Sequence, residues 1–248
     1  MTSVGPELWR AQMDALRDLL SARVPRLVGI YLHGSAALGG FGPASDLDVL
    51  AVVEDLPTPG WDQIAQEILA VSKGGRALEL SVVRRRDAAR PASPWPFVLH
   101  VSSGEHRWAL GGQGGDPDLL AHYAVVRAAG VPLLGPDPSS VVGAVDRDAL
   151  LAYLVDELDW GVAEADQRYV VLNACRAIVY AEQGELLSKQ AGGRWWIARN
   201  GPSDLVAAAL DAQTAGADLG ACSQHARDFV GAARAHLLTA LRQGAPEA

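Results

Sequence analysis

Apolar positions along the chain follow two different periods, and the change between them divides the sequence into two parts. In the first part, short apolar runs bounded by glycine, proline or charged residues predict strands, and apolar residues at spacings of three and four predict amphipathic helices. The strands are expected at residues 27–34, 46–53, 77–83 and 97–101. The helices are expected at residues 5–23, 61–72 and 116–130, with Gly130 placed to end the last.

From Asp146 onward the strand pattern ceases, and the remaining segments all repeat their apolar residues at helical spacing. Residues 131–145 separate the two parts, and the prolines, glycines and serines of this segment are typical of irregular connections. The sequence therefore predicts an α/β (α+β) domain at residues 1–140, followed by an all-helical domain at residues 141–248.

Length and composition are those of a globular protein. The chain has 248 residues, of which 49% are hydrophobic and 20% charged, and no run approaches the roughly 20 apolar residues of a membrane span. Residues 1–10 lack the basic and apolar regions of a secretion signal. We expect a cytoplasmic monomer with no membrane partner. Cys175 and Cys222 lie in alanine-rich, helix-like surroundings and are expected to be buried free thiols.

The charge balance bears on the choice of partner. The formal net charge is −8 and the sequence pI is about 5.2, so the surface repels phosphate backbones. This excludes duplex nucleic acid as an expected partner and favours a cationic small molecule.

The segment most informative about chemistry is residues 33–48, HGSAALGGFGPASDLD. Gly34 and Ser35 end a predicted strand and open a helix, where backbone N–H groups and a hydroxyl can bind phosphate. Asp46 and Asp48 begin the next strand, and side chains two residues apart in a strand point to the same face. Paired carboxylates of this kind suit Mg²⁺ that also binds phosphate oxygens.

Glu79 is a lone charge within the otherwise apolar strand 77–83. A charge at such a position is costly unless it is paired, ligated or catalytic. A Gly-Ser turn, an Asp-x-Asp pair and a strand glutamate are each common, and alone each indicates a turn or a solvent-exposed position. Their occurrence in this order along the chain is much rarer and predicts a phosphate- and metal-dependent site.

These residues resemble a known family. The stretch GSAALGGFGPASDLDVLAVV is similar to the signature of nucleotidyltransferases with the DNA polymerase β fold. RALELSVV, SSGEHR, VPLLGP and DQRYVVLNACRAIVYAEQGELLSK resemble segments of the aminoglycoside (3″)(9) adenylyltransferases, which inactivate streptomycin and spectinomycin. The resemblance covers most of residues 27–199. It implies a mixed sheet, ATP as co-substrate, two Mg²⁺ ions and transfer of AMP to an acceptor hydroxyl with release of pyrophosphate.

The resemblance also implies roles for particular residues. It implies that Glu79 is the catalytic base, that Asp46 and Asp48 bind metal, and that His106 and Asp166 contact the acceptor. The alternative for Asp166 is an ordinary interhelical or capping aspartate. Residues that bind the nucleotide phosphates would be Gly34, Ser35, Arg176 and Lys189.

Two departures from the family pattern affect the acceptor. His106 stands where members that accept streptomycin commonly have tryptophan, and residues 160–164 lack an aspartate that such members carry. We therefore expect spectinomycin to be favoured over streptomycin. The pair Trp195 and Trp196 is expected to pack in the core of a buried helix rather than to stack on a base.

The function predicted from the sequence is adenylylation of an aminoglycoside or aminocyclitol antibiotic. One alternative is a nucleotidyltransferase of the same fold that acts on a protein side chain, a tRNA end or another small molecule. A further alternative is a regulator that binds nucleotide without catalysis. The joint presence of Ser35, Asp46, Asp48 and Glu79 argues against the regulator, which would not need all four.

Overall fold

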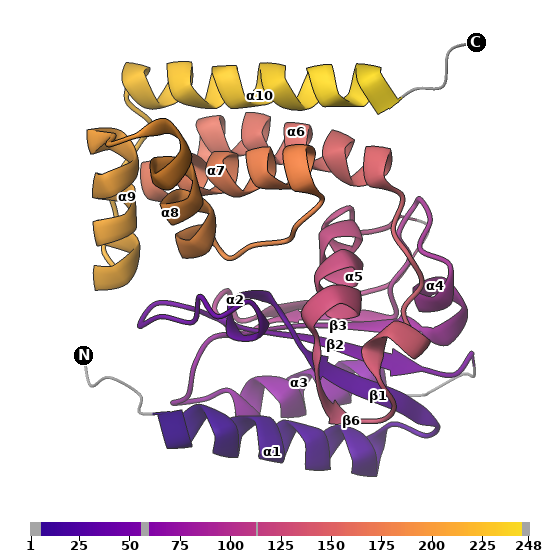
Figure 1. The fold of residues 1–248 in the computed structure, drawn as a ribbon. Helices are drawn as coiled ribbons and strands as arrows, with labels where there is room; N and C mark the ends of the chain where they lie inside the picture. Colours follow the sequence, from indigo (N-terminus) through magenta and orange to yellow (C-terminus); the bar gives the residue numbers. More distant parts are fainter. Residues whose placement is uncertain (1–5, 56–59, 113, 245–248) are drawn as a thin grey trace. The chain divides into compact units, whose positions relative to one another are not determined.

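The computed structural model describes residues 6–55, 60–112 and 114–244 (Figure 1). The described residues divide into two compact units. Of the described residues, those within 6–37 and 45–145 form the first unit, and those within 38–44 and 146–244 form the second. The glycine-rich part of the motif thus belongs to the helical unit, which pattern reading did not foresee. The domain boundary after residue 140 stays a prediction.

The first unit is built on a mixed sheet, as the resemblance implied. Among the described residues the sheet has six strands in the order β5-β4-β3-β2-β1-β6. β2 and β3 are parallel, and the other neighbours are antiparallel. The strands are β1 (Leu27–Leu32), β2 (Leu47–Val53), β3 (Leu78–Arg84), β4 (Leu99–Ser102), β5 (Arg107–Leu110) and β6 (Val131–Leu134).

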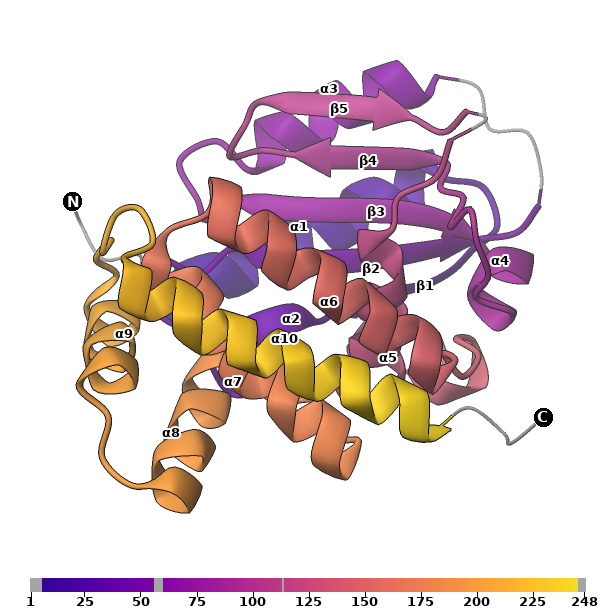
Figure 2. The same ribbon diagram turned by 90° about the horizontal axis from the view of Figure 1, so that it is seen from above.

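Helices cover both faces of this sheet (Figures 1 and 2). α1 (Pro6–Arg23) and α3 (Trp61–Val71) lie on one face, and α5 (Asp118–Ala129) lies on the other. The central strands are therefore apolar almost throughout, because a strand buried on both faces does not alternate with polar residues. Two short helices, α2 (Gly34–Ala37) and α4 (Arg85–Ala89), and the 3₁₀ turn η1 (Pro138–Ser140) complete the unit.

One core cluster fixes which face of the sheet meets α5. Leu50 and Val52 of β2 and Val83 of β3 pack in the same buried cluster as Leu119 and Tyr123 of α5. Since side chains alternate along a strand, the residues that share this face of β2 and β3 include Asp48 and Glu79.

Both strands that pattern reading missed lie at an edge of the sheet. The prediction of irregular structure across residues 131–145 is wrong at its start, because Val131–Leu134 forms β6. Pro132 is tolerated there because an edge strand does not need all its N–H groups for pairing. β5 is short and largely exposed, so it lacks the apolar run that marks a buried strand.

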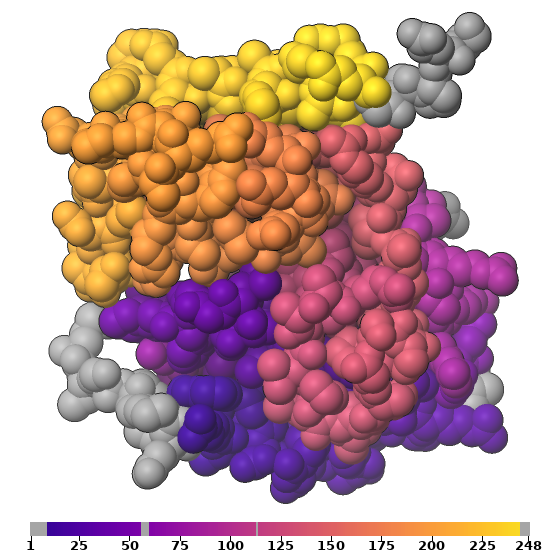
Figure 3. Space-filling model, in the orientation of Figure 1, coloured from indigo at the N-terminus to yellow at the C-terminus, as the bar shows by residue number. Residues whose placement is uncertain are grey.

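The second unit is helical, as predicted. Its helices are α6 (Arg147–Glu164), α7 (Gln167–Gln183), α8 (Lys189–Asn200), α9 (Asp204–Ala215) and α10 (Gln224–Gly244). α7 is central and packs against the other four. α10 forms an outer surface of this unit, seen in yellow in Figure 3. Cys175 and Cys222 are buried free thiols within the described chain, which confirms the prediction. No helix among the described residues combines the length and apolar character needed to cross a membrane.

Candidate active site

The sheet places two of the predicted site residues side by side. In the parallel register of β2 and β3, Asp48 is the direct partner of Glu79. Asp46 lies immediately before β2, which begins at Leu47. Both carboxylates of the pair therefore stand near the beginning of their strands, on the face that α5 covers.

The Gly-Ser turn lies directly against this pair. Gly34 has a φ of 58°, in the left-handed region, and a Cβ atom at this position would collide with the carboxylate of Asp48. The backbone N–H of His33 donates to the carbonyl oxygen of Asp48 at 2.9 Å. Two independent features therefore require glycine at position 34: the left-handed backbone conformation and the close approach of the Asp48 side chain. Because α2 has only 4 residues, it contributes a turn of backbone rather than a long helix dipole.

The electrostatic environment of Glu79 is strongly acidic. Burial raises the pKa of its carboxyl group, and the neighbouring carboxylates Asp48, Asp118 and Asp46 raise it further, while His122 opposes them. Burial is the main reason why the ionised carboxylate is disfavoured, and the neighbouring carboxylates add to it. A bound cation would favour the ionised form.

The donor set suits magnesium bound together with a nucleotide. Within the described ranges, no group of three or more His, Cys, Asp or Glu side chains is arranged to hold a metal ion. Mg²⁺ is usually held by one or two carboxylates together with substrate phosphates, rather than by a complete protein cage. Asp46 and Asp48, beside the acidic Glu79, fit that kind of site.

Three residues around Glu79 were missed by sequence reasoning. α5 contributes Asp118 and His122, which are four residues apart and so share one side of the helix. β4 contributes His100, whose Nε2 lies 3.9 Å from Oε1 of Glu79 and whose Nδ1 lies 3.1 Å from the hydroxyl of Ser81. The i, i+4 spacing of Asp118 and His122 in the predicted helix 116–130 was a signal available in the sequence.

Two histidine rings pack together beside these carboxylates. The ring centroids of His33 and His122 are 4.8 Å apart. Burial, and to a smaller extent His122, hold the pKa of His33 well below its usual range, so His33 is neutral in the folded protein. Nδ1 of His122 is buried and makes no hydrogen bond to the described part of the chain.

His106 lies in the turn that joins β4 to β5. Ser102 pairs with Arg107 across this hairpin, and His106 closes the turn with a φ of 52° and an exposed side chain. The left-handed conformation is one that such hairpin loops require at their last residue. The contact with an acceptor that the resemblance implied for His106 stays a prediction.

The helical unit holds both predicted cations, and tyrosine Tyr169 is close to each. Lys189, the first residue of α8, places its Nζ 3.9 Å from the centroid of the Tyr169 ring. Arg176 follows Tyr169 by seven residues on α7, and its charge lowers the pKa of the phenol against the larger effects of burial and Glu157. Sequence reasoning identified the cations but missed Tyr169 and Glu157.

Asp166 has a structural role in this unit. As the N-cap of α7, its Oδ1 accepts a hydrogen bond from the N–H of Arg168 at 2.9 Å. Its Oδ2 accepts from the N–H groups of Leu219 and Gly220 at 2.7 and 2.6 Å, which ties the α9–α10 connection to the start of α7. The acceptor contact implied for Asp166 stays a prediction, and these bonds already use both carboxylate oxygens.

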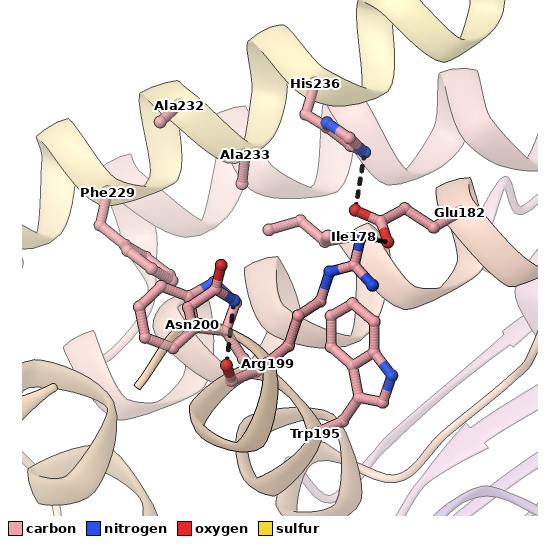
Figure 4. Close-up of a pocket in the computed structure, with 10 residues that line it drawn as sticks. Ile178, Glu182, Trp195, Arg199, Asn200, Phe229, Ala232, Ala233 and His236 are labelled. Carbon is pink, nitrogen blue, oxygen red and sulfur yellow. Dashed lines mark hydrogen bonds and ion pairs between the residues drawn. The ribbon is translucent and has the colours of Figure 1, made fainter. Parts of the chain in front are cut away.

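A cavity of 210 Å³ in the helical unit is lined by none of the predicted catalytic, metal-binding, nucleotide-binding or acceptor-binding residues (Figure 4). Trp195 and Trp196 of α8 line it and are only half-buried, so the prediction that they pack in the core is wrong. The guanidinium of Arg199 lies over the Trp195 ring, and Trp196 meets Phe229 of α10 edge to face. Arg199 and His236 both approach Glu182, at 3.1 and 3.6 Å.

Two family models match the chain, one in the sheet unit and one mostly in the helical unit. A nucleotidyltransferase domain matches residues 13–85, and the C-terminal domain of aminoglycoside adenylyltransferase matches residues 140–231. In three dimensions the chain is similar to the spectinomycin adenyltransferase AAD(9) from Enterococcus faecialis, crystallised with ATP and spectinomycin. The TM-score is 0.70 and the sequence identity 19%, covering 94% of this chain and 99% of the other, which confirms the fold.

Curated relatives agree with these matches. The chain is 31% identical over 203 residues to a spectinomycin 9-adenylyltransferase of Staphylococcus aureus, covering 75% of each chain. It is 27% identical over 199 residues to an aminoglycoside (3″)(9) adenylyltransferase of Klebsiella pneumoniae, covering 71% of this chain and 72% of the relative. The chain therefore belongs to the aminoglycoside adenylyltransferase family of nucleotidyltransferases.

Proposed function

We propose that this protein transfers AMP from Mg-ATP to a hydroxyl group of an aminocyclitol antibiotic, with spectinomycin favoured over streptomycin, and releases pyrophosphate. The observation that carries the proposal is the pairing of Asp48 with Glu79 directly against the Gly34 turn. The relatives named for spectinomycin adenylylation support the acceptor. The exposed His106 and the lack of an aspartate at residues 160–164 support the preference.

Asp46 and Asp48 would hold two Mg²⁺ ions together with the triphosphate. When bound, the metal neutralises charge on the triphosphate and on the departing pyrophosphate, which is the main electrostatic demand of phosphoryl transfer. The two aspartates serve this purpose because their neighbours in β2 are buried and fix the strand. The carboxylates of Asp46, Asp48 and Asp118 near the buried Glu79 support the proposal that a cation is bound here.

Glu79 would accept the proton of the acceptor hydroxyl. The hydroxyl oxygen forms a bond to the α-phosphorus, the bond from that phosphorus to the bridging oxygen breaks, and pyrophosphate carries away the electron pair. A base that takes the proton must lie within about 2.6 to 3.2 Å of the hydroxyl. Glu79 suits this step because it lies in the sheet, where the register with β2 holds it beside Asp48.

The resemblance assigns the remaining phosphate contacts to Gly34, Ser35, Arg176 and Lys189. Gly34 and Ser35 would bind phosphate oxygens through backbone N–H groups and the serine hydroxyl. Arg176 and Lys189 would add positive charge to the triphosphate, Arg176 through a fork of donors and Lys189 as a compact point charge. Their positive charge would act on the triphosphate although the chain as a whole has a net charge of −8.

Product analysis tests the proposal. The purified protein is incubated with ATP, Mg²⁺ and either spectinomycin or streptomycin, and the drugs are then examined by mass spectrometry. We expect spectinomycin to gain the mass of one adenylyl group, with a lower rate on streptomycin. The Glu79→Gln variant, purified in the same way, is the control. Adenylylation that persists at the wild-type rate in this variant would come from a contaminating enzyme. The proposal fails if neither drug is modified while the protein itself or added tRNA gains AMP.

A further inference from the structure

The ammonium group of Lys189 lies over an aromatic ring. Its Nζ is 3.9 Å from the ring centroid of Tyr169, well within the range of a cation–π interaction. Tyr169 is in the first turn of α7, and Lys189 is the first residue of α8. The two helix starts thus bring a flexible cation onto a rigid ring.

The backbone around Lys189 is held in place independently of its side chain. A Cβ atom at Gly192 would lie 2.9 Å from Cα of Arg176, so α8 approaches α7 as closely as glycine permits. Ser188 caps α8, its hydroxyl accepting from the N–H of Ala191 at 3.2 Å. A Cβ atom at Gly40, in the glycine-rich part of the motif, would overlap the Ser188 side chain. The backbone at Lys189 is therefore fixed, and only the four-carbon side chain has conformational freedom.

The Tyr169 ring is itself anchored at its far end. Its hydroxyl donates to Oε1 of Glu157 on α6 at 2.7 Å, and the side-chain amide of Asn173 donates to the same oxygen at 3.4 Å. Burial, and then Glu157, raise the pKa of the phenol, so the hydroxyl keeps its proton and remains a donor. The Trp160 ring meets Tyr169 edge to face at 6.1 Å. These contacts hold the ring plane on which the ammonium rests.

We propose that Tyr169 is a positioning residue, whose anchored ring holds the Lys189 ammonium ready to contact the triphosphate. This inference rests on the proposed function, which assigns Lys189 to the nucleotide. Lysine has a flexible four-carbon stem and loses much rotamer freedom when its charge is fixed. Tyrosine has only two side-chain torsions, so an anchored ring fixes the lysine at a small further entropic cost.

The inference predicts an effect on nucleotide binding that passes through Lys189. Removing the aromatic face should weaken binding of a non-hydrolysable Mg-ATP analogue about threefold to thirtyfold, the range of a partly desolvated cation–π contact. Tyr169→Leu removes the ring. Tyr169→Phe keeps the ring and loses only the anchor to Glu157, so the loss should stay within about threefold.

A double-mutant cycle separates positioning from a general structural effect. The dissociation constant of the analogue is measured by calorimetry for wild type, Tyr169→Leu, Lys189→Met and the double variant. If Tyr169 acts through Lys189, the ring substitution has no further effect once the ammonium is gone. Tyr180→Leu is the matched control, because Tyr180 is a buried tyrosine of the same helix and takes no part in the Lys189 contact.

The outcomes are distinguishable. Losses that multiply in the double variant, or a loss of equal size in Tyr180→Leu, would overturn the positioning role. A wild-type protein that binds no analogue, or a Lys189→Met variant that binds as wild type, would instead overturn the assignment of Lys189 in the proposed function. If Tyr169→Leu does not fold, Tyr169→Met replaces it, because methionine fills volume without an aromatic face. An undiminished affinity in the variant that removes the ring, Tyr169→Leu or Tyr169→Met, would refute the inference.

Discussion

Two carboxylates, one in each unit, show how differently the same chemical group can be used. Glu79 in the sheet unit and Asp166 in the helical unit are both largely sheltered, with side chains 36% and 17% exposed. Asp166 accepts hydrogen bonds from three backbone N–H groups, those of Arg168, Leu219 and Gly220. Glu79 lies beside Asp48 and near further carboxylates that raise its pKa.

The contrast shows that the surroundings of a carboxylate indicate its role more reliably than its residue type. Hydrogen-bond donors stabilise the Asp166 carboxylate, and Asp166 in return holds two segments of the helical unit together. Burial, and then the neighbouring carboxylates, make the ionised form of Glu79 unfavourable in the folded state, and such an arrangement is typical of sites that gain a cationic ligand or carry out proton transfer. Each substitution below tests one side of this comparison.

The largest effect is expected at Asp48. Asp48→Asn removes an anionic ligand and leaves the triphosphate charge without its metal counterion, so adenylyl transfer should be abolished. Asp46→Asn should act in the same direction. Turnover is measured with ATP and Mg²⁺ saturating, and circular dichroism checks that the fold survives. Retention of more than about a tenth of wild-type turnover in either variant would remove that residue from the metal site.

Glu79→Gln should have the next largest effect. The amide keeps the shape of the side chain and loses its basicity, so kcat should fall by roughly 10² to 10⁴ while affinity for Mg-ATP changes little. Parallel loss of nucleotide affinity would identify Glu79 as a metal ligand instead.

The same variant also tests whether the ionised carboxylate of Glu79 destabilises the folded protein. A raised pKa in the folded protein means that ionising Glu79 opposes folding at pH values above its unfolded pKa. In the absence of metal at neutral pH, Glu79→Gln should therefore unfold at the same or a higher denaturant concentration than wild type. A clear decrease would show that Glu79 stabilises the fold, as Asp166 does.

Periodicity and the motif predicted the central sheet, the helical second unit and the neighbourhood of Asp48 and Glu79. These succeed because a doubly covered strand must be apolar, and because a charge within such a strand stands out. β5 and β6 were missed because edge strands are short and part-exposed, so burial does not impose a pattern on them. The half-burial of Trp195 and Trp196 was missed because aromatic residues at helical spacing indicate a packed face without showing how deep it lies.

Part of the site depends on packing that a one-dimensional pattern does not contain. His100 approaches Glu79 across a strand pair, and His122 approaches it from a helix on the covering layer. Asp166 differs from these two histidines because the sequence did single it out. The resemblance implied a contact with the acceptor, and in the structure Asp166 is the N-cap of α7. The capping role was one of the interpretations that the sequence left open for Asp166. The bonds to Leu219 and Gly220 leave no signal in the sequence, because these residues lie more than fifty residues away.

A smaller effect, on stability rather than chemistry, is expected at Asp166. Asp166→Asn keeps one acceptor oxygen and loses the charge that strengthens its hydrogen bonds, so the free energy of unfolding should fall by about 1 to 2 kcal/mol. Asp218→Asn is the matched control, because Asp218 is 79% exposed and its ion pair with Arg168 lies at the surface. Urea unfolding of both variants provides the measurement. Equal stabilities would contradict the structural role, and a raised KM for the drug beyond any loss of folded protein would support the predicted acceptor contact.

The smallest effect is expected at Cys175, where burial, and no neighbouring charged side chain, raises the pKa of the thiol. Cys175 of α7 is fully buried, and burial raises the pKa of its thiol to about 12, whereas the pKa of an unfolded cysteine is near 8.5. Below the unfolded pKa both states carry the proton, so Cys175 adds no pH dependence to stability. Above it the unfolded thiol ionises while the folded one does not, and stability is lost by about 1.4 kcal/mol at pH 9.5. The difference in unfolding free energy between wild type and Cys175→Ala, followed from pH 7 to 9.5, cancels other titrating groups and should change by that amount. A pH-independent difference would mean that the thiol ionises with the same pKa in the folded and the unfolded chain, and that burial does not raise the pKa of Cys175.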